Sequence, residues 1–224
     1  MGIVVSATTV KNVLRDEHLG PAGKRRSLSW REFLRAQAKS MIAVDFFTVD
    51  TVWLQRLYVL FFIEIGSRRV HVAGYTAHPH GEWVTQQARQ VAWRLAERAE
   101  PVRFLIRDHD RKFARAFDAV FEAQETSIVR TPIQVPEANG IAERFVRTVR
   151  SECLDWLLIG NARHLVRALT VFTDHYNGFR PHRSLGLAPP NGRPPIETWT
   201  GAQPITVKRR DRLGGLLREY ERAA

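Results

Sequence analysis

"MIAVDFFTVD", residues 41–50, is the stretch from which the fold follows. It is rich in β-branched and aromatic residues, so it predicts a strand. Two similar stretches come next, "WLQRLYVLFFIEIG" at residues 53–66 and "RRVHVAGYTA" at residues 68–77. Because only short turns separate the three, they are expected to form an antiparallel meander.

After the meander, helical and strand patterns alternate. Apolar residues spaced by three and four predict a helix over residues 82–98, and "VRFLIRD" (102–108) is a short apolar strand. A helix is predicted over "KFARAFDAVFEAQ" (112–124), a strand over "TSIVRTP" (126–132), and further helices over residues 141–150 and 161–176. This order predicts an α/β fold whose mixed sheet adds parallel strands to an antiparallel start and is flanked by helices.

Basic residues are concentrated in the two flanks of the chain. The 224 residues carry a formal net charge of +11, and the segment 41–135 is nearly neutral. Such a balance favours a polyanionic partner, with nucleic acid ahead of an anionic membrane surface. Two clusters are expected to touch phosphates without sequence preference: Lys24, Arg25 and Arg26, and Lys208, Arg209 and Arg210.

Several classes of protein are excluded by what the sequence lacks. Cys153 stands alone, so neither a disulfide framework nor a cysteine zinc site can be built. The longest apolar run, residues 57–63, is far too short to span a bilayer, and we see no secretory signal. These features predict a cytoplasmic protein with no membrane partner. The six tryptophans are expected to lie in the core or to serve in packing rather than to stack on bases.

Three carboxylates occupy positions suited to a metal site. Asp45 lies inside the first strand, Asp108 ends the strand "VRFLIRD", and Glu143 opens the helix after the turn "PEANG". An acid within an apolar strand is costly to bury unless it is paired or holds a metal. Mg²⁺ takes carboxylate and phosphate oxygens, and two such ions can support phosphoryl transfer. The alternative is that all three acids are solvent-exposed ends of strands and helices.

These residues carry a resemblance to the integrase core of insertion-sequence transposases. That family has an Asp in the first strand, an Asp after the fourth and a Glu about 35 residues later, which Asp45, Asp108 and Glu143 match. "PEANGIAERF" resembles its Pro-x-x-Asn-Gly-x-x-Glu motif, and "HYNGFRPHRSLGLAPP" (175–190) resembles a segment that follows its core. The resemblance covers residues 40–200 and implies a ribonuclease-H-like fold.

The resemblance also implies a reaction. Asp45, Asp108 and Glu143 would be catalytic and would bind two Mg²⁺ or Mn²⁺ ions. A DDE transposase of this type cleaves DNA at the transposon end and joins the freed 3′-hydroxyl to target DNA, at least as a dimer. Asp110 stays open as a ligand in place of Asp108. Asp50 is a rival to Asp45 but ends its strand and is assigned to a turn, and Glu137 does not fit the spacing and is interpreted as a solvated loop charge.

DNA contacts are expected around this centre. Arg147 and Arg150 share the helix face of Glu143, and Arg150 matches a family position that contacts the DNA end. The further expected contacts are Asn139, Arg180, His182 and Arg183, although a segment that wraps the core would look the same.

Three regions are expected in the chain. Residues 1–40 are a truncated helix-turn-helix remnant and basic linker, and residues 41–177 are the integrase catalytic core. Residues 178–224 are a Pro-rich and basic extension that ends in a helix. Two other functions stay open, a ribonuclease-H-like nuclease without strand transfer and an inactive DNA-binding remnant.

Overall fold

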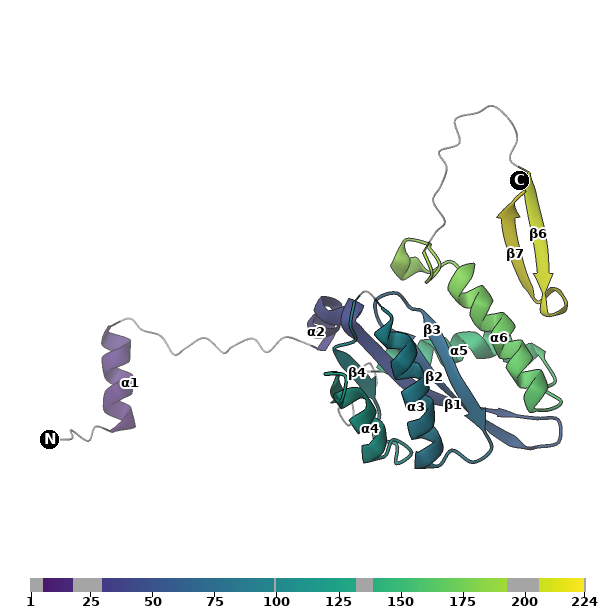
Figure 1. Ribbon diagram of the computed structural model, residues 1–224. Helices are drawn as coiled ribbons and strands as arrows, with labels where there is room; N and C mark the ends of the chain where they lie inside the picture. Colours follow the sequence, from purple (N-terminus) through teal and green to yellow (C-terminus); the bar gives the residue numbers. More distant parts are fainter. Residues whose placement is uncertain (1–5, 18–29, 99, 132–138, 193–205, 224) are drawn as a thin grey trace. The chain divides into compact units, whose positions relative to one another are not determined.

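A computed structural model of the chain describes residues 6–17, 30–98, 100–131, 139–192 and 206–223 (Figure 1). The chain divides into two compact units, Met1–Ala36 and Gln37–Ala224. The first unit contains α1 (Ala7–Asp16) and most of α2 (Trp30–Gln37). Ser6 Oγ accepts a hydrogen bond from Thr9 N at 3.1 Å and so caps α1. The predicted boundaries after residues 40 and 177 stay predictions.

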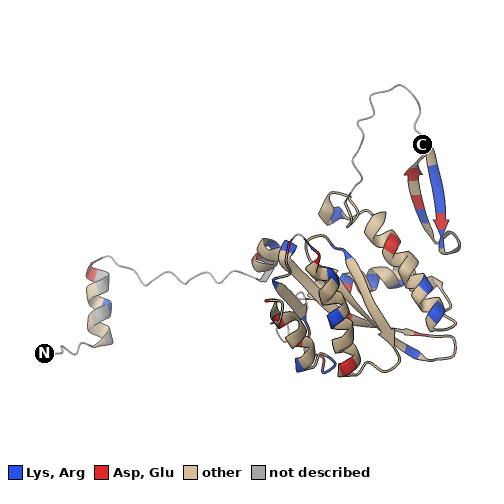
Figure 2. Ribbon diagram, viewed as in Figure 1, with Lys and Arg blue, Asp and Glu red and all other residues tan. Residues whose placement is uncertain are grey.

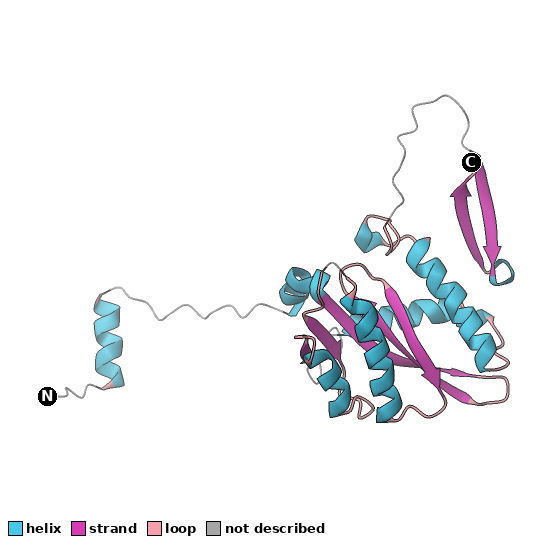
Figure 3. Cartoon of the chain, in the orientation of Figure 1, coloured by secondary structure: helices cyan, strands magenta, loops and turns pink. Residues whose placement is uncertain are grey.

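The second unit is built on a five-stranded sheet in the order β3-β2-β1-β4-β5 (Figure 3). Strands β1 (Met41–Asp50), β2 (Arg56–Glu64) and β3 (Val70–Thr76) form an antiparallel meander. Strands β4 (Phe104–Arg107) and β5 (Ser127–Arg130) add to β1 in parallel. The predicted mixed sheet is therefore confirmed.

Helices α3 (Gly81–Ala96) and α4 (Arg115–Glu122) cover one face of this sheet. Ile42, Val44, Leu60 and Phe62 point to that face and are fully buried in a cluster with both helices. Because side chains alternate along a strand, Asp45 and Phe47 point to the opposite face. Burying each large apolar side chain stabilises the fold by about 1.5–3 kcal/mol, so this cluster holds β1 firmly in place.

Helices α5 (Gly140–Glu152) and α6 (Ala162–Gly178) pack on the face of Asp45. Phe145 of α5 lies between Phe61 of β2, with ring centroids 4.8 Å apart, and Tyr176 of α6, at 5.2 Å. The short helices η1 (Ala38–Ser40), η3 (Leu154–Trp156) and η4 (Arg183–Leu185) fill the connections. The side chain of Asn177 both accepts from Val70 N and donates to Val70 O at 2.9 Å, which ties the end of α6 to β3.

The predicted C-terminal helix is wrong, because the structure has a β-hairpin there. β6 (Val207–Arg212) pairs with β7 (Leu217–Arg222) across the turn η5 (Leu213–Gly215). Gly214 and Gly215 have φ of 69° and 92°, a left-handed conformation that glycine adopts easily and that suits a hairpin turn. Glu219 of β7 is buried and lies 3.4 Å from His175 Nδ1, so the hairpin contacts α6.

Three of the tryptophans that were expected in the core or in packing are mostly exposed to solvent. Trp53, Trp93 and Trp156 are 82%, 75% and 72% exposed, whereas Trp83 packs against the core cluster. The side chain of Trp30 and all of Trp199 lie outside the described residues. Within the described ranges, no helix has the length and apolar character needed to cross a membrane.

Candidate functional site

Asp45 is held in place by two hydrogen bonds. Its Oδ1 accepts from the backbone N–H of Phe46 at 2.7 Å, and its Oδ2 accepts from Asn139 Nδ2 at 3.0 Å. Asn139 directly precedes α5, so this second bond fixes the start of that helix against the middle of β1. The Asn-Gly turn, predicted from sequence as local turn chemistry, thus also orients the strand carboxylate.

The pKa of Asp45 is raised to about 6. Burial is the largest cause, and the Phe46 N–H partly offsets it by stabilising the carboxylate. The negative charges of Asp108, Glu143 and Asp110 raise it further, in that order. The charges of Asp108 and Glu143 therefore reach Asp45, although the three predicted site carboxylates come from β1, the end of β4 and the first turn of α5.

Asp108 and Asp110 have different environments. Asp108 Oδ1 accepts from Asp110 N at 3.0 Å, which closes a tight turn just after β4. The carboxylate of Asp110 accepts from Lys112 N at 2.9 Å and forms an ion pair with Lys112 Nζ. Asp110 is thus neutralised by a cation two residues away. This difference favours Asp108 over Asp110 as a ligand for a metal ion.

A buried ion pair supports the backbone of Asp108. Arg107 donates from Nε and Nη2 to both oxygens of Asp118, at 2.8 and 2.7 Å, and from Nη1 to the carbonyl of Asp108 at 2.8 Å. The side chains of Arg107 and Asp118 are only 5% and 7% exposed. Arg130 of β5 adds a third contact to Asp118 at 3.2 Å. Sequence reasoning missed both residues, although a charged residue within each apolar run was a usable signal.

Glu143 is exposed on the first turn of α5, with Arg147 one turn further along. Arg150 Nη2 donates to the carbonyl of Thr48 at 2.8 Å. Together with the Asn139–Asp45 bond, this contact shows that α5 runs beside β1 in the same direction. Within the described ranges, no three His, Cys, Asp or Glu side chains are arranged closely enough to hold a metal ion as they stand.

Other predicted DNA contacts are partly engaged within the protein. Arg180 forms a two-point ion pair with Glu152, at 2.7 and 2.5 Å, and its guanidinium lies over the ring of Tyr176. His182 is buried against Tyr176, and burial lowers its pKa, whereas Arg183 is exposed. Their roles as DNA contacts stay predictions.

Basic residues of the flanks have different outcomes. Lys208, Arg209 and Arg210 are exposed along β6, which Figure 2 shows as a mostly basic strand. Lys24, Arg25, Arg26 and Glu137 lie outside the described residues.

Asp50, the alternative to Asp45, is exposed at the end of β1 and pairs with Arg56 at 2.9 Å. That pairing leaves Asp45 as the acid that faces Asp108 and Glu143.

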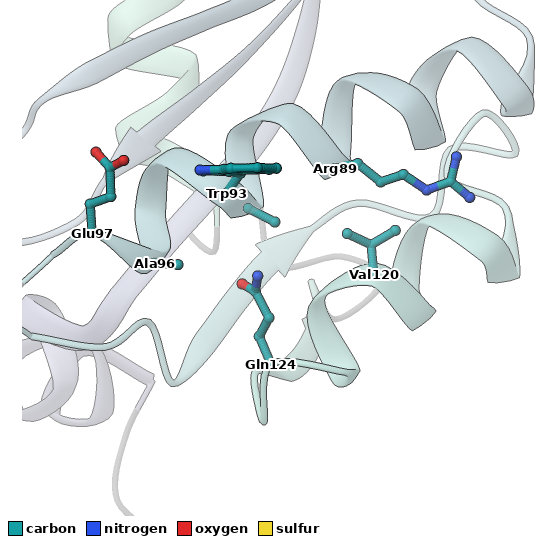
Figure 4. A pocket seen from close by; sticks show the side chains of 7 residues that line it. Arg89, Trp93, Ala96, Glu97, Val120 and Gln124 are labelled. Carbon is teal, nitrogen blue, oxygen red and sulfur yellow. The ribbon is translucent and has the colours of Figure 1, made fainter.

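A surface hollow between α3 and α4 is separate from these residues (Figure 4). Its lining includes Trp93, Val120 and Gln124, and none of the residues that line it is a predicted site residue. Figure 4 shows the ring of Trp93 lying beside this hollow, in which Val120 and Gln124 of the neighbouring segment face α3. The carboxylates lie on the opposite face of the sheet, so the hollow plays no part in their chemistry.

The raised pKa of Asp45 makes a prediction about stability. A carboxyl with a folded pKa near 6 and an ordinary value of 3.8 holds its proton more tightly in the folded state. Its contribution therefore favours folding at about pH 4 and is lost as the pH rises through 6. In EDTA, Asp45→Asn should melt at a higher temperature than wild type at pH 8.

The advantage of Asp45→Asn should shrink toward pH 4, as followed by circular dichroism. The buried Oδ1 of Asn139 has no hydrogen-bond partner among the described residues, so rotation of that amide can accommodate the new side chain. Asp50→Asn is the matched control, because the bond from Arg56 lowers the pKa of Asp50. This exposed variant should gain no melting-temperature advantage over wild type between pH 4 and 8. If the melting temperature of Asp45→Asn exceeded that of wild type by the same amount at pH 4 and pH 8, the raised pKa of Asp45 would be contradicted.

Comparison with known families gives one match within the chain. Residues 124–190 match the family model of the integrase core domain. This segment begins just after α4 and contains β5, α5 and α6, so it includes Glu143 but neither Asp45 nor Asp108.

Comparisons with individual proteins agree with this match. The putative transposase InsD for insertion element IS2E of Escherichia coli strain K12 is 33% identical over 60 residues, which cover 27% of this chain and 28% of that protein. The match thus spans less than a third of this relative.

Among solved structures, the catalytic core domain of HTLV-2 integrase in complex with magnesium has a TM-score of 0.51 at 11% identity, covering 66% of this chain and 92% of that chain. The catalytic core domain of BIV integrase has a TM-score of 0.50 at 16% identity, covering 68% and 91%. At these identities the likeness concerns the fold, which is that of an integrase catalytic core.

Proposed function

We propose that this chain, through an integrase-like core of the kind found in insertion-sequence transposases, cleaves DNA ends and joins them to target DNA. The observation that carries the proposal is the meeting of the start of α5 with β1, where Asn139 Nδ2 donates to Asp45 Oδ2 and the charges of Asp108 and Glu143 reach Asp45. These acids come from three separate elements of the sheet and its helices, and they match the pattern of acids that the resemblance implies.

The donor set suits a hard divalent cation, because it consists of carboxylate oxygens. Burial is the main cause of the raised pKa of Asp45, and the negative charges of Asp108, Glu143 and Asp110 add to it. A bound cation would favour the ionised carboxylate against both effects. Two Mg²⁺ or Mn²⁺ ions bound by Asp45, Asp108 and Glu143 would stabilise charge on the attacking and leaving oxygens of phosphoryl transfer. Asn139 would keep Asp45 oriented, and the Arg107–Asp118 pair would keep Asp108 at the end of β4.

The proposed reaction has two phosphoryl transfers. In the first, a water oxygen attacks phosphorus at the DNA end, the bond to the 3′ oxygen breaks, and a 3′-hydroxyl is freed. In the second, that hydroxyl attacks a phosphodiester of the target strand and releases a new 3′-hydroxyl. Arg147 and Arg150 would hold backbone phosphates beside Glu143. Two DNA ends call for at least two copies of the chain, acting in the cytoplasm on bound DNA.

A cleavage and joining assay tests the proposal. Labelled duplexes from the DNA that flanks the gene are incubated with the protein, a plasmid target and Mn²⁺. The expected result is shortened strands and strands joined to plasmid, both absent in EDTA and with Asp45→Asn. Cleavage without joining would support a ribonuclease-H-like nuclease, and binding without either would support an inactive remnant. Both outcomes would reject the proposed reaction.

Cation binding also predicts a stability change that does not depend on any DNA substrate. A ligand that binds only the folded state stabilises it by about 2.7 kcal/mol at one hundred times its dissociation constant. Mn²⁺ should therefore raise the melting temperature of the wild type, and Asp45→Asn should respond much less. KCl at the same ionic strength is the control for screening. Equal Mn²⁺ responses of the two proteins would argue against Asp45 as a ligand.

A further inference from the structure

The turn between β1 and β2 displays large apolar side chains to solvent. The consecutive residues Val52, Trp53 and Leu54 are all exposed to solvent, by 47%, 82% and 87%. Contiguous exposed apolar surface on a folded domain usually marks a contact with another molecule. None of the site residues described above lies in this turn, so its exposure needs a separate explanation.

The turn is rigid rather than loosely built. Thr51 N donates to Gln55 O at 2.9 Å, Leu54 N donates to Thr51 O at 2.8 Å, and Gln55 N donates to Thr51 Oγ1 at 3.1 Å. Leu54 has a φ of 58°, a left-handed conformation that Gly or Asn adopts at a lower cost. The turn therefore holds a leucine outward at a position where leucine is unfavourable for folding.

A second segment extends the apolar surface. Val52 N donates to Ile159 O at 2.9 Å, which fixes the turn against the segment that follows η3. The neighbour of Ile159, Leu158, is 84% exposed. We call Val52, Trp53, Leu54 and Leu158 the apolar tip. Its two backbone segments are bonded to each other, so its shape is set before any partner arrives.

The apolar tip lies at the end of a path that begins at the carboxylates. Asp45 and Asn139 mark one end, where α5 begins beside β1, and the Arg150–Thr48 contact marks the other. With about 3.3 Å per strand residue, the tip is roughly 20 Å from Asp45. That length corresponds to about six base steps of 3.4 Å. A DNA strand that follows α5 past Arg147 and Arg150 would reach the tip.

Charge favours DNA over a second copy of the chain as the partner. Arg163 and Arg167 are exposed on α6, which begins three residues after Ile159. Two copies that met through their tips would bring together chains of net charge +11 each, and that repulsion opposes the contact. A polyanion has the opposite effect, because its phosphates are attracted by the same arginines.

We propose that the apolar tip is a base-contacting subsite, with Trp53 stacking on an exposed base and Leu54 wedging beside it. The subsite depends on one part of the proposed function, the binding of DNA along α5, and does not require that the protein cleave or join DNA. Aromatic side chains stack on bases with little sequence preference, and apolar side chains such as leucine are used to open base steps.

Binding is tested with a duplex that ends in a short single-stranded overhang. The duplex carries 2-aminopurine at one position at a time, and EDTA is present so that no reaction occurs. Trp53→Ala and Leu54→Asn should each weaken binding by about tenfold in fluorescence anisotropy. The wild type should change 2-aminopurine emission at a confined set of positions, and Trp53→Ala should remove that change.

Two matched controls are available in the chain. Trp93 is also highly exposed, but it lies on α3, and Leu187 is an exposed leucine with a φ of 65°. Trp93→Ala and Leu187→Asn should bind the duplex as the wild type does. Because Asn adopts the left-handed conformation readily, neither leucine change should lower the melting temperature.

The possible outcomes separate this subsite from the proposed function. Tip-dependent DNA binding by a protein that never cleaves DNA would uphold the subsite and reject the proposed function. Unchanged DNA affinity in both tip variants would overturn the subsite. The subsite would also be overturned if the two tip variants kept their DNA affinity but lost self-association in ultracentrifugation. The same holds if they kept it but lost binding to vesicles of anionic phospholipid.

Discussion

Asp108→Asn should reduce Mn²⁺-dependent DNA cleavage by at least about a hundredfold, whereas Asp110→Asn should retain most of it. Changes in the supporting residues of metal sites already cost about 10–100-fold, so loss of a ligand is expected to cost at least as much. The two acids are two residues apart, but Lys112 neutralises only Asp110. Asp108 is also the larger of the two influences on the pKa of Asp45.

Initial rates of cleavage at saturating Mn²⁺ give this comparison directly. Melting temperatures of both variants ensure that a loss of rate is not a loss of folding. If Asp108→Asn kept full activity while Asp110→Asn lost it, the carboxylate set would have to be reassigned to Asp45, Asp110 and Glu143.

Asp118→Ala should destabilise the fold by about 3–5 kcal/mol, the largest stability effect we expect from a single change in a charged side chain. Removing one partner of a buried ion pair leaves the other charge uncompensated. Here Arg107 would lose both oxygens that it binds, inside a site where each side chain is at most 7% exposed. Urea denaturation followed by circular dichroism measures the change in the free energy of unfolding.

Two further variants define the cause of that loss. Asp50→Ala breaks the exposed pair with Arg56 and should leave the urea midpoint unchanged. Arg107→Met combined with Asp118→Leu should recover most of the stability, because an apolar pair can replace a buried ion pair. The double variant should cleave DNA more slowly than wild type even though its stability is recovered, because the bond from Arg107 to the Asp108 carbonyl is gone. Full cleavage by the double variant would show that this bond does not position Asp108.

The sheet could be predicted from the sequence because its strands have unambiguous patterns. Residues 41–76 are dominated by β-branched and aromatic residues, and the structure forms β1, β2 and β3 from them. The C-terminal hairpin was missed because "LREYER" spaces its charges as a helix does. The better signal was the Gly214–Gly215 pair, whose positive φ angles place a tight turn between the two strands.

The candidate site was predictable only in its residue types and spacing. The spacing of the acids suggested that they meet, but nothing local in the sequence joins Asn139 to Asp45, which are 94 residues apart. The Arg107–Asp118 pair depends on how α4 packs beside β4, which is a tertiary contact. The exposure of Trp53 and Trp156 could not be predicted either. The local sequence around a tryptophan in a turn is the same whether or not other parts of the fold cover its side chain.

Asn177 has a consequence for how the protein behaves at high concentration. β3 is one of the two edge strands of the sheet, and an open strand edge is a template on which another chain can add a strand. The Asn177 amide occupies both outward hydrogen-bonding groups of Val70, as a neighbouring strand would. A strand of another molecule therefore cannot pair with β3 at Val70, and this single side-chain amide reduces the tendency of the sheet edge to aggregate.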